Sequence, residues 1–148
     1  MSSSRRKMIA AAALLGGMPG GAAQAQTGAG WSPKKLAAGG PVRSGHLLFL
    51  SGIGGWYPER KPKAGDVREQ TADALEIMKA SLEKAGSSME NVLKVTVALV
   101  DPEANWEPMN EVYDKYFPKA KPARSYWGAT GFRRKGQLLQ IDAIAYVD

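Results

Sequence analysis

Two charged residues, Arg124 and Asp142, have the chemical character and the local setting for work on a small acid. Arg124 belongs to the run Pro122-Ala123-Arg124-Ser125, in which a conformationally restricted proline precedes the start of a predicted strand. A guanidinium held there could bind a carboxylate through two parallel hydrogen bonds. Asp142 lies inside an apolar strand, so it is exposed, paired with a cation such as Arg124, or used for proton transfer. From spacing alone, an ordinary surface arginine explains Arg124 at least as well, and an exposed position on a sheet face explains Asp142 better.

The composition removes several kinds of chemistry. The 148 residues include no cysteine and a single histidine, His46. Disulfide scaffolds, iron–sulfur clusters, cysteine-ligated zinc and thiol nucleophiles are therefore excluded. Most zinc sites need at least two His or Cys ligands, and a Ser-His-Asp triad would have to use this one imidazole. We expect no metal site, and chemistry carried by carboxylates, arginine, lysine, hydroxyls, backbone groups and water.

Residues 1–25 have the order of an export signal. A basic start at Ser4-Arg5-Arg6-Lys7 precedes a short apolar run, and Ala23-Gln24-Ala25 supplies a small-x-small cleavage site. The paired arginines resemble a twin-arginine signal, which indicates a periplasmic address. The apolar run is shorter than the about 20 residues that span a bilayer, so we expect no stable membrane association after cleavage. The alternative is a tail with incidental arginines, which leaves the protein in the cytoplasm.

Cleavage of this signal changes what the charge indicates. The formal net charge of +6 falls to +3, because residues 1–25 carry three basic residues and no acid. A charge of this size is a weak indication of a nucleic-acid partner, and we expect none. The remaining compact basic run, Arg133-Arg134-Lys135, is predicted to form the solvated tip of a hairpin.

The rest of the chain is predicted to form one domain over residues 41–148, after a flexible lead-in at 26–40. Hydrophobic periodicity of 2 or 3.6 residues defines its elements. In chain order these are a strand at 47–52, a helix at 67–85, a strand at 92–100, a helix at 105–117, and strands at 125–130 and 138–147.

Caps and breakers mark the ends of the two helices. Asp66 followed by Glu69 is a capping-box pattern, and Gly86 is placed to end the first helix. Asn105 is predicted to cap the second helix, with Pro108 in its first turn. In the strand at 92–100, the side chains of Leu93, Val95, Val97 and Leu99 are predicted to share the buried face.

Two helices are too few to cover both faces of a sheet, so both are predicted to pack on one face of a mixed sheet in an α+β layer. In the last strand, one face carries Leu139, Ile141, Ala143, Ala145 and Val147, and the other carries Leu138, Gln140, Asp142, Ile144 and Tyr146. The second face is rather apolar for contact with solvent. We therefore expect the protein to form an oligomer.

Four segments together resemble the reactive-intermediate deaminase (Rid/YjgF) family in order and spacing. They are Leu48-Phe49-Leu50-Ser51-Gly52, Asn105-Trp106-Glu107-Pro108-Met109-Asn110-Glu111-Val112-Tyr113-Asp114-Lys115-Tyr116-Phe117, Pro122-Ala123-Arg124-Ser125 and Gln140-Ile141-Asp142-Ala143-Ile144-Ala145. The Pro-Ala-Arg-Ser element and the Ile-acid-Ala strand form the most specific part. The resemblance covers about residues 41–148, so the chain is identified as an exported member of this family.

The resemblance implies a chorismate-mutase-like α+β fold, a homotrimer, and active sites in the clefts between subunits. Family members hydrolyse enamine/imine acids of the 2-iminobutanoate and 2-iminopropanoate type to 2-oxo acids and ammonia, without a cofactor. On this chain Arg124 matches the arginine that binds the substrate carboxylate, and Asp142 falls where the family usually has a glutamate that orients the attacking water. The other substrate-binding matches are Ser51, Gly52, Asn110 and Tyr126, the last through its backbone carbonyl.

Three positions depart from the family pattern. Asp142 is one methylene shorter than glutamate, which withdraws the carboxylate by roughly 1.5 Å. The segment 37–41 lacks the tyrosine of deaminase members, and Tyr126 replaces a common cysteine.

Two other functions therefore stand beside the deaminase. One is a non-catalytic small-carboxylate-binding or chaperone-like trimer, which needs the arginine but not the standard acid. The other is an endoribonuclease or translation inhibitor, a label sometimes attached to the family. An exported protein meets no ribosome, and the only candidate basic patch is the run at 133–135.

Overall fold

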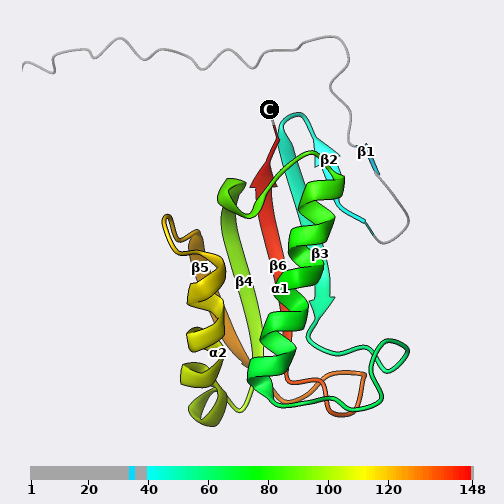
Figure 1. The fold of residues 1–148 in the computed structure, drawn as a ribbon, viewed down its shortest axis with the longest axis vertical. Coiled ribbons are helices and arrows are strands. Elements are labelled where there is room, and N and C mark those ends of the chain that lie inside the picture. Colours follow the sequence, from blue (N-terminus) through cyan, green and yellow to red (C-terminus); the bar gives the residue numbers. More distant parts are fainter. Residues whose placement is uncertain (1–33, 36–39, 148) are drawn as a thin grey trace, which may run out of the picture.

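The structure, a computed structural model of the chain, describes residues 34–35 and 40–147. In chain order its elements are β1 Lys34–Lys35, β2 Val42–Ser44, β3 Leu47–Gly54, α1 Val67–Lys84, the 3₁₀ helix η1 Met89–Asn91, β4 Val92–Val100, α2 Pro102–Tyr116, β5 Ala123–Ala129 and β6 Leu139–Tyr146. Figure 1 shows α1 and α2 side by side on one face of a single sheet. The predicted α+β architecture, with both helices on one face of a mixed sheet, is confirmed.

The amino-terminal predictions fall largely outside this description. The export signal predicted at 1–25 lies outside the described residues, as does most of the lead-in at 26–40. Lys34–Lys35 of the lead-in forms β1, which pairs antiparallel with β2. No helix in the described part of the chain is long and apolar enough to cross a membrane.

Helix α1 has the cap that the sequence predicts. The Glu69 amide donates to Asp66 Oδ1 at 2.9 Å, and the Asp66 amide donates to Glu69 Oε2 at 3.0 Å, which completes the capping box. At the other end Gly86 takes a φ of 81°, the left-handed conformation that commonly follows a helix. The buried face of α1 consists of Val67, Gln70, Thr71, Ala74, Leu75, Met78 and Leu82.

Asp66→Ala is expected to lower the free energy of unfolding by about 1 kcal/mol, because the first turn of α1 loses its side-chain acceptor. Urea denaturation measures the change. Arg68→Ala is the matched control in the same turn, because its exposed ion pair with Glu111 at 2.8 Å contributes only about 0.3 kcal/mol. Equal losses in the two variants would contradict the capping role.

Helix α2 begins earlier than predicted. Its N-cap is Asp101 and its first residue is Pro102, so the assignment of Asn105 as the cap is wrong and Pro108 lies inside the helix. An N-cap aspartate followed by proline is the stronger start signal, because the φ angle of proline is already helical. The Asn105 side chain instead donates to the Val100 carbonyl at 2.9 Å.

The sheet order β1-β2-β3-β6-β4-β5 places β6 in the centre and β5 at an edge. β6 pairs antiparallel with β3 and β4, whereas β5 pairs in parallel with β4 through the α2 crossover. The hairpin predicted from the last two strands is therefore wrong, because β4 separates them.

The run Arg133-Arg134-Lys135 lies in a loop at the end of the sheet, where the Arg134 guanidinium lies 4.4 Å from the Tyr57 ring centroid. Gln70 of α1 holds this loop by donating to the Gly136 carbonyl at 2.8 Å.

The two faces of the sheet differ as predicted for β6. Leu139, Ile141, Ala143, Ala145 and Val147 are all buried under the helices. The face without helices, here called the open face, carries Leu47 and Phe49 of β3, each 39% exposed. The prediction that Leu93 lies on the buried face is wrong, since a register shift between Val92 and Lys94 turns it outward.

Candidate functional site

Ser51, Gly52 and Asp142 meet at a bulge between β3 and β6. The register pairs Leu50 with Ala143 and Ile53 with Ile141, so Ser51 and Gly52 both stand opposite Asp142. Gly52 adopts a φ of 70°, a left-handed conformation that glycine takes without strain. The sequence Ser-Gly at this point therefore builds a bulge, and the bulge takes its backbone out of the regular ladder.

The bulge directs two donors to one carboxylate. The Gly52 amide donates to Asp142 Oδ1 at 2.7 Å, and the Ser51 hydroxyl donates to the same oxygen at 3.1 Å. Because both bonds use Oδ1, the second oxygen of Asp142 is left for a water or a ligand. These three predicted site residues are thus brought together by the structure.

A hollow of about 240 Å³ lies over this carboxylate on the open face. Its lining residues are Phe49, Leu50, Ser51, Lys94, Thr96, Asp142, Ala143 and Ile144. Lys94 Nζ donates to Ser125 Oγ at 2.6 Å, which ties the hollow to the edge strand β5. The hollow combines an apolar wall with one acid and one cation.

Arg124 lies elsewhere, between β5 and α2. Its guanidinium carbon is 4.4 Å from the ring centroid of Tyr113 and 4.9 Å from that of Trp106. Both rings belong to α2, and Tyr126 of β5 packs on Trp106 with 4.2 Å between ring centroids. Aromatic faces attract a guanidinium electrostatically, so Arg124 is held by rings and not by a carboxylate.

Three buried polar atoms in this group lack a hydrogen-bond partner. They are Asn110 Oδ1, Tyr113 OH and Arg124 Nη1, and in the described part of the chain they are the only buried side-chain nitrogen or oxygen atoms without one. Asn110 follows Trp106 by four residues and precedes Tyr113 by three, so all three side chains lie on the same face of α2. Unpaired buried polar atoms are costly and rare, and their concentration in one place indicates a site that a ligand completes.

The charge states in this group suit an anionic ligand. Burial raises the pKa of Tyr113 to about 12, against a smaller opposing effect of the Arg124 charge. Tyr113 is therefore a neutral phenol at physiological pH and can donate a hydrogen bond. The group offers one cation, one neutral donor and one amide oxygen.

Arg124 and Asp142 lie on opposite faces of the sheet. Arg124 pairs with Val95, which is buried under the helices, whereas Asp142 pairs with Thr96 on the open face. Side chains of paired residues point to the same face, and successive residues alternate. The predicted site residues therefore form two separate groups: Ser51, Gly52 and Asp142 on the open face, and Asn110, Arg124 and Tyr126 on the helix side.

Sequence reasoning missed two members of the helix-side group. Tyr113 and Trp106 both lie within the motif at 105–117, but neither was given a role in the site. The spacing of Trp106, Asn110 and Tyr113 could have indicated a shared helix face, since residues four and three apart are neighbours on a helix. That these rings hold an arginine depends on the parallel pairing of β5, which the sequence analysis did not predict.

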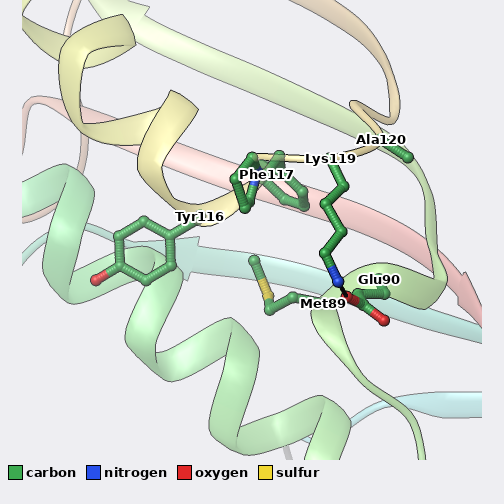
Figure 2. A pocket seen from close by; sticks show the side chains of 7 residues that line it. Met89, Glu90, Tyr116, Phe117, Lys119 and Ala120 are labelled. Atoms are coloured by element: carbon green, nitrogen blue, oxygen red, sulfur yellow. Dashed lines mark hydrogen bonds and ion pairs between the residues drawn. The ribbon is translucent and has the colours of Figure 1, made fainter.

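A second hollow of about 240 Å³ lies between η1 and the end of α2 (Figure 2). Met89, Tyr116 and Phe117 form its apolar part, and Lys119 pairs with Glu90 at 3.1 Å. Figure 2 shows the Tyr116 hydroxyl pointing away from this ion pair. The hollow contains none of the predicted site residues and none of the three unpaired polar atoms.

No group of three or more His, Cys, Asp or Glu side chains among residues 34–35 and 40–147 is arranged to hold a metal ion. The candidate site consists of the two groups already described.

A single mixed sheet with two helices on one face, a Ser-Gly bulge and an arginine at the edge strand place the chain in the α+β class. Residues 39–147 match the profile of the family described as Endoribonuclease L-PSP. The chain belongs to this family, which includes the RutC, YjgF and reactive-intermediate deaminase proteins.

Several relatives share the whole domain. A RutC family protein of Pyrococcus horikoshii is 41% identical over 106 residues, which cover 71% of this chain and 82% of the relative. The chloroplastic Reactive Intermediate Deaminase A of Arabidopsis thaliana is 35% identical over 117 residues, covering 76% and 62% respectively. These two relatives extend the resemblance seen in the motifs to most of the chain.

Solved structures agree with the fold. A putative endoribonuclease from Thermotoga maritima has a TM-score of 0.67 at 33% identity, covering 79% of this chain and 92% of that one. A YjgF family member from Mycobacterium tuberculosis has a TM-score of 0.67 at 27% identity, covering 78% and 100%. The expected YjgF-like fold is thereby confirmed.

Proposed function

We propose that this protein is a cofactor-free deaminase that hydrolyses 2-imino acids, of the 2-iminobutanoate and 2-iminopropanoate type, to 2-oxo acids and ammonia. The observation that carries the proposal is the concentration of unpaired buried polar atoms at Asn110, Tyr113 and Arg124. Arg124 Nη1 is a cationic donor for a carboxylate, and Asn110 Oδ1 is an acceptor for the N–H of an imine. The pair thus matches the two polar ends of a 2-imino acid. The family membership and the name of the Arabidopsis relative support the same reaction.

The reaction needs few groups, because the carbon of a protonated imine is already electrophilic. Arg124 binds the carboxylate and fixes the position of that carbon. The second oxygen of Asp142 accepts a proton from water as the water oxygen bonds to the carbon. Asp142 then gives this proton to the nitrogen. As the carbon–nitrogen bond breaks, the new hydroxyl gives its proton to Asp142 and becomes the carbonyl of the 2-oxo acid, and the departing ammonia takes that proton away as ammonium. No electrons are gained or lost.

The two halves of this site come from different subunits in our proposal. Arg124 and Asp142 lie on opposite faces of the sheet, so one chain cannot present both to one small substrate. The open face supplies the contact surface, since Phe49 and Ile144 are paired on it beside Asp142. We take the assembly to be a homotrimer, as the family resemblance implies, with one cleft at each interface.

Phe49→Glu is expected to convert the oligomer to monomers and to lower deaminase activity about a hundredfold or more. A charge buried in an interface without a partner costs several kcal/mol, whereas Phe49 is 39% exposed in the single chain and tolerates a polar replacement there. Size-exclusion chromatography with light scattering measures the mass. Ala80→Glu adds the same charge to the exposed side of α1 and should change neither property. A Phe49→Glu oligomer with full activity would contradict an interface on the open face.

A coupled assay tests the reaction itself. An amino-acid dehydratase generates 2-iminobutanoate, semicarbazide competes for it, and the protein is expected to divert the flux to 2-oxobutanoate and ammonia. A rate equal to that of buffer, with the oligomer intact, would reject the deaminase.

The second candidate is a trimer that binds small carboxylates without turning them over. Asp142 favours it, because its carboxylate is held by Ser51 and Gly52 and is shorter than the usual glutamate. This alternative predicts that 2-oxobutanoate raises the melting temperature while the coupled assay shows no turnover. Endoribonuclease activity is named in the family description and in that of the Thermotoga structure. No feature of the candidate site favours this activity over the other two.

A further inference from the structure

Five side chains form a continuous stack from the interior to the edge of the domain. Phe117 packs on Tyr113 with 4.8 Å between ring centroids, and Tyr113 lies 4.4 Å from the guanidinium carbon of Arg124. The same guanidinium carbon lies 4.9 Å from the ring centroid of Trp106. The Trp106 ring in turn packs on Tyr126, with 4.2 Å between ring centroids. Phe117 and Tyr113 are 3% and 1% exposed, whereas Tyr126 is 52% exposed. The stack therefore has a rigid buried end and an end that faces outward.

Arg124 lies in the middle of this stack, and its setting is unusual for an arginine. No Asp or Glu pairs with it among the ion pairs of the described residues, and its Nη1 is buried without a hydrogen-bond partner. The rings of Tyr113 and Trp106 hold the side chain instead. Such contacts are worth roughly 0.5 to 2 kcal/mol each, depending on exposure to water.

Holding a guanidinium flat matters for carboxylate recognition. Bidentate binding requires the two nitrogens and the two carboxylate oxygens to lie in one plane. An unclamped arginine must lose rotamer freedom when it binds, which costs affinity. A ring contact restricts the side chain before the ligand binds, so less rotamer freedom is lost on binding. It leaves the N–H groups free, because the ring contacts the face of the guanidinium and not its edge.

We propose that Trp106 is a positioning residue, which fixes the plane of the Arg124 guanidinium so that its free edge faces the substrate carboxylate. This inference rests on the proposed function and adds a residue to it. Tyr113 is the second ring in contact with the guanidinium, and its packing on Phe117 fixes it in the core. Trp106 is the ring that can be tested, because it is only partly buried against the edge of the core, whereas Tyr113 is a member of the core cluster.

The test compares Trp106→Leu with Trp106→Phe, using 2-oxobutanoate for binding by calorimetry and 2-iminobutanoate for turnover. Trp106→Leu is expected to raise the dissociation constant and KM about tenfold, the equivalent of one contact of about 1.4 kcal/mol. Trp106→Phe keeps an aromatic face and should stay within about threefold of the wild type. Trp56→Leu removes a tryptophan from the loop between β3 and α1 and should leave binding unchanged.

An arginine-to-lysine background separates positioning from mere packing. In Arg124→Lys the planar group is gone, so adding Trp106→Leu should weaken binding by less than about twofold further. A full tenfold loss in both backgrounds, or wild-type affinity in Trp106→Leu, would overturn the role of Trp106. A wild-type protein that neither binds nor turns over these compounds would instead reject the proposed function, and the inference with it.

Discussion

Arg124→Ala is expected to lower kcat/KM for 2-iminobutanoate by about two to three orders of magnitude. The substrate carboxylate loses its cationic partner inside a partly buried site, and removing one member of such a charged pair costs on the order of 3 to 4 kcal/mol. Most of the loss should appear in KM, since the guanidinium binds the carboxylate before and during reaction. Binding of 2-oxobutanoate, measured by calorimetry, should fall below detection.

Arg134→Ala is the matched control for this variant. Arg134 also lies over an aromatic ring, that of Tyr57, at 4.4 Å, but in the loop at the end of the sheet. It should keep wild-type kinetics, which separates loss of substrate binding from loss of a cation–π contact. Thermal unfolding and light scattering verify that Arg124→Ala remains folded and oligomeric. A folded Arg124→Ala protein with unchanged KM would contradict the proposed carboxylate site.

The elements that the sequence predicted well are those whose signals are local. The capping box at Asp66 and Glu69, the alternation along β6 and the end of α1 at Gly86 each depend on a few neighbouring residues. The start of α2 was misplaced because two local signals competed, and Asp101-Pro102 prevailed over Asn105. Helix ends are decided by caps of similar strength, so the first competent one sets the boundary.

The errors in the sheet have a different origin. Strand order is set by long-range pairing, and the parallel β4–β5 pair over the α2 crossover cannot be read from periodicity. Leu93 was placed on the wrong face because a bulge between Val92 and Lys94 adds one residue to β4, which puts Leu93 out of step with Val95, Val97 and Leu99, all buried as predicted. The same effect, at Ser51 and Gly52, builds the donor pair for Asp142.

The candidate site was predictable only as a set of residue types. The Pro-Ala-Arg-Ser element and the acid at 142 marked two groups with suitable chemistry. Their placement on opposite faces follows from which residues of β4 they adjoin, Val95 for Arg124 and Thr96 for Asp142. Adjacent positions on one strand thus separate the two charged groups by the full thickness of the sheet. Because of this separation, a site that uses both Arg124 and Asp142 must take them from two different subunits.

A shared site predicts that two inactive variants restore activity to each other. Arg124→Ala and Asp142→Asn should each be almost inactive as pure oligomers. Co-expressed and selected as mixed trimers, they should recover about a third of the wild-type activity per subunit, because a trimer that contains both variants pairs an intact Arg124 with an intact Asp142 at one of its three interfaces. Assays of the mixed oligomer, purified through two different affinity tags, measure the recovery.

The control mixture combines Arg124→Ala with the double variant Arg124→Ala/Asp142→Asn. No copy in it carries the arginine, so it should stay inactive, which excludes recovery through stabilisation of the oligomer alone. If each site lay within one chain, every site in the first mixture would keep its own defect, and activity would not rise above that of the parents. Recovery therefore requires that the arginine and the acid come from different copies, as their opposite faces of the sheet demand.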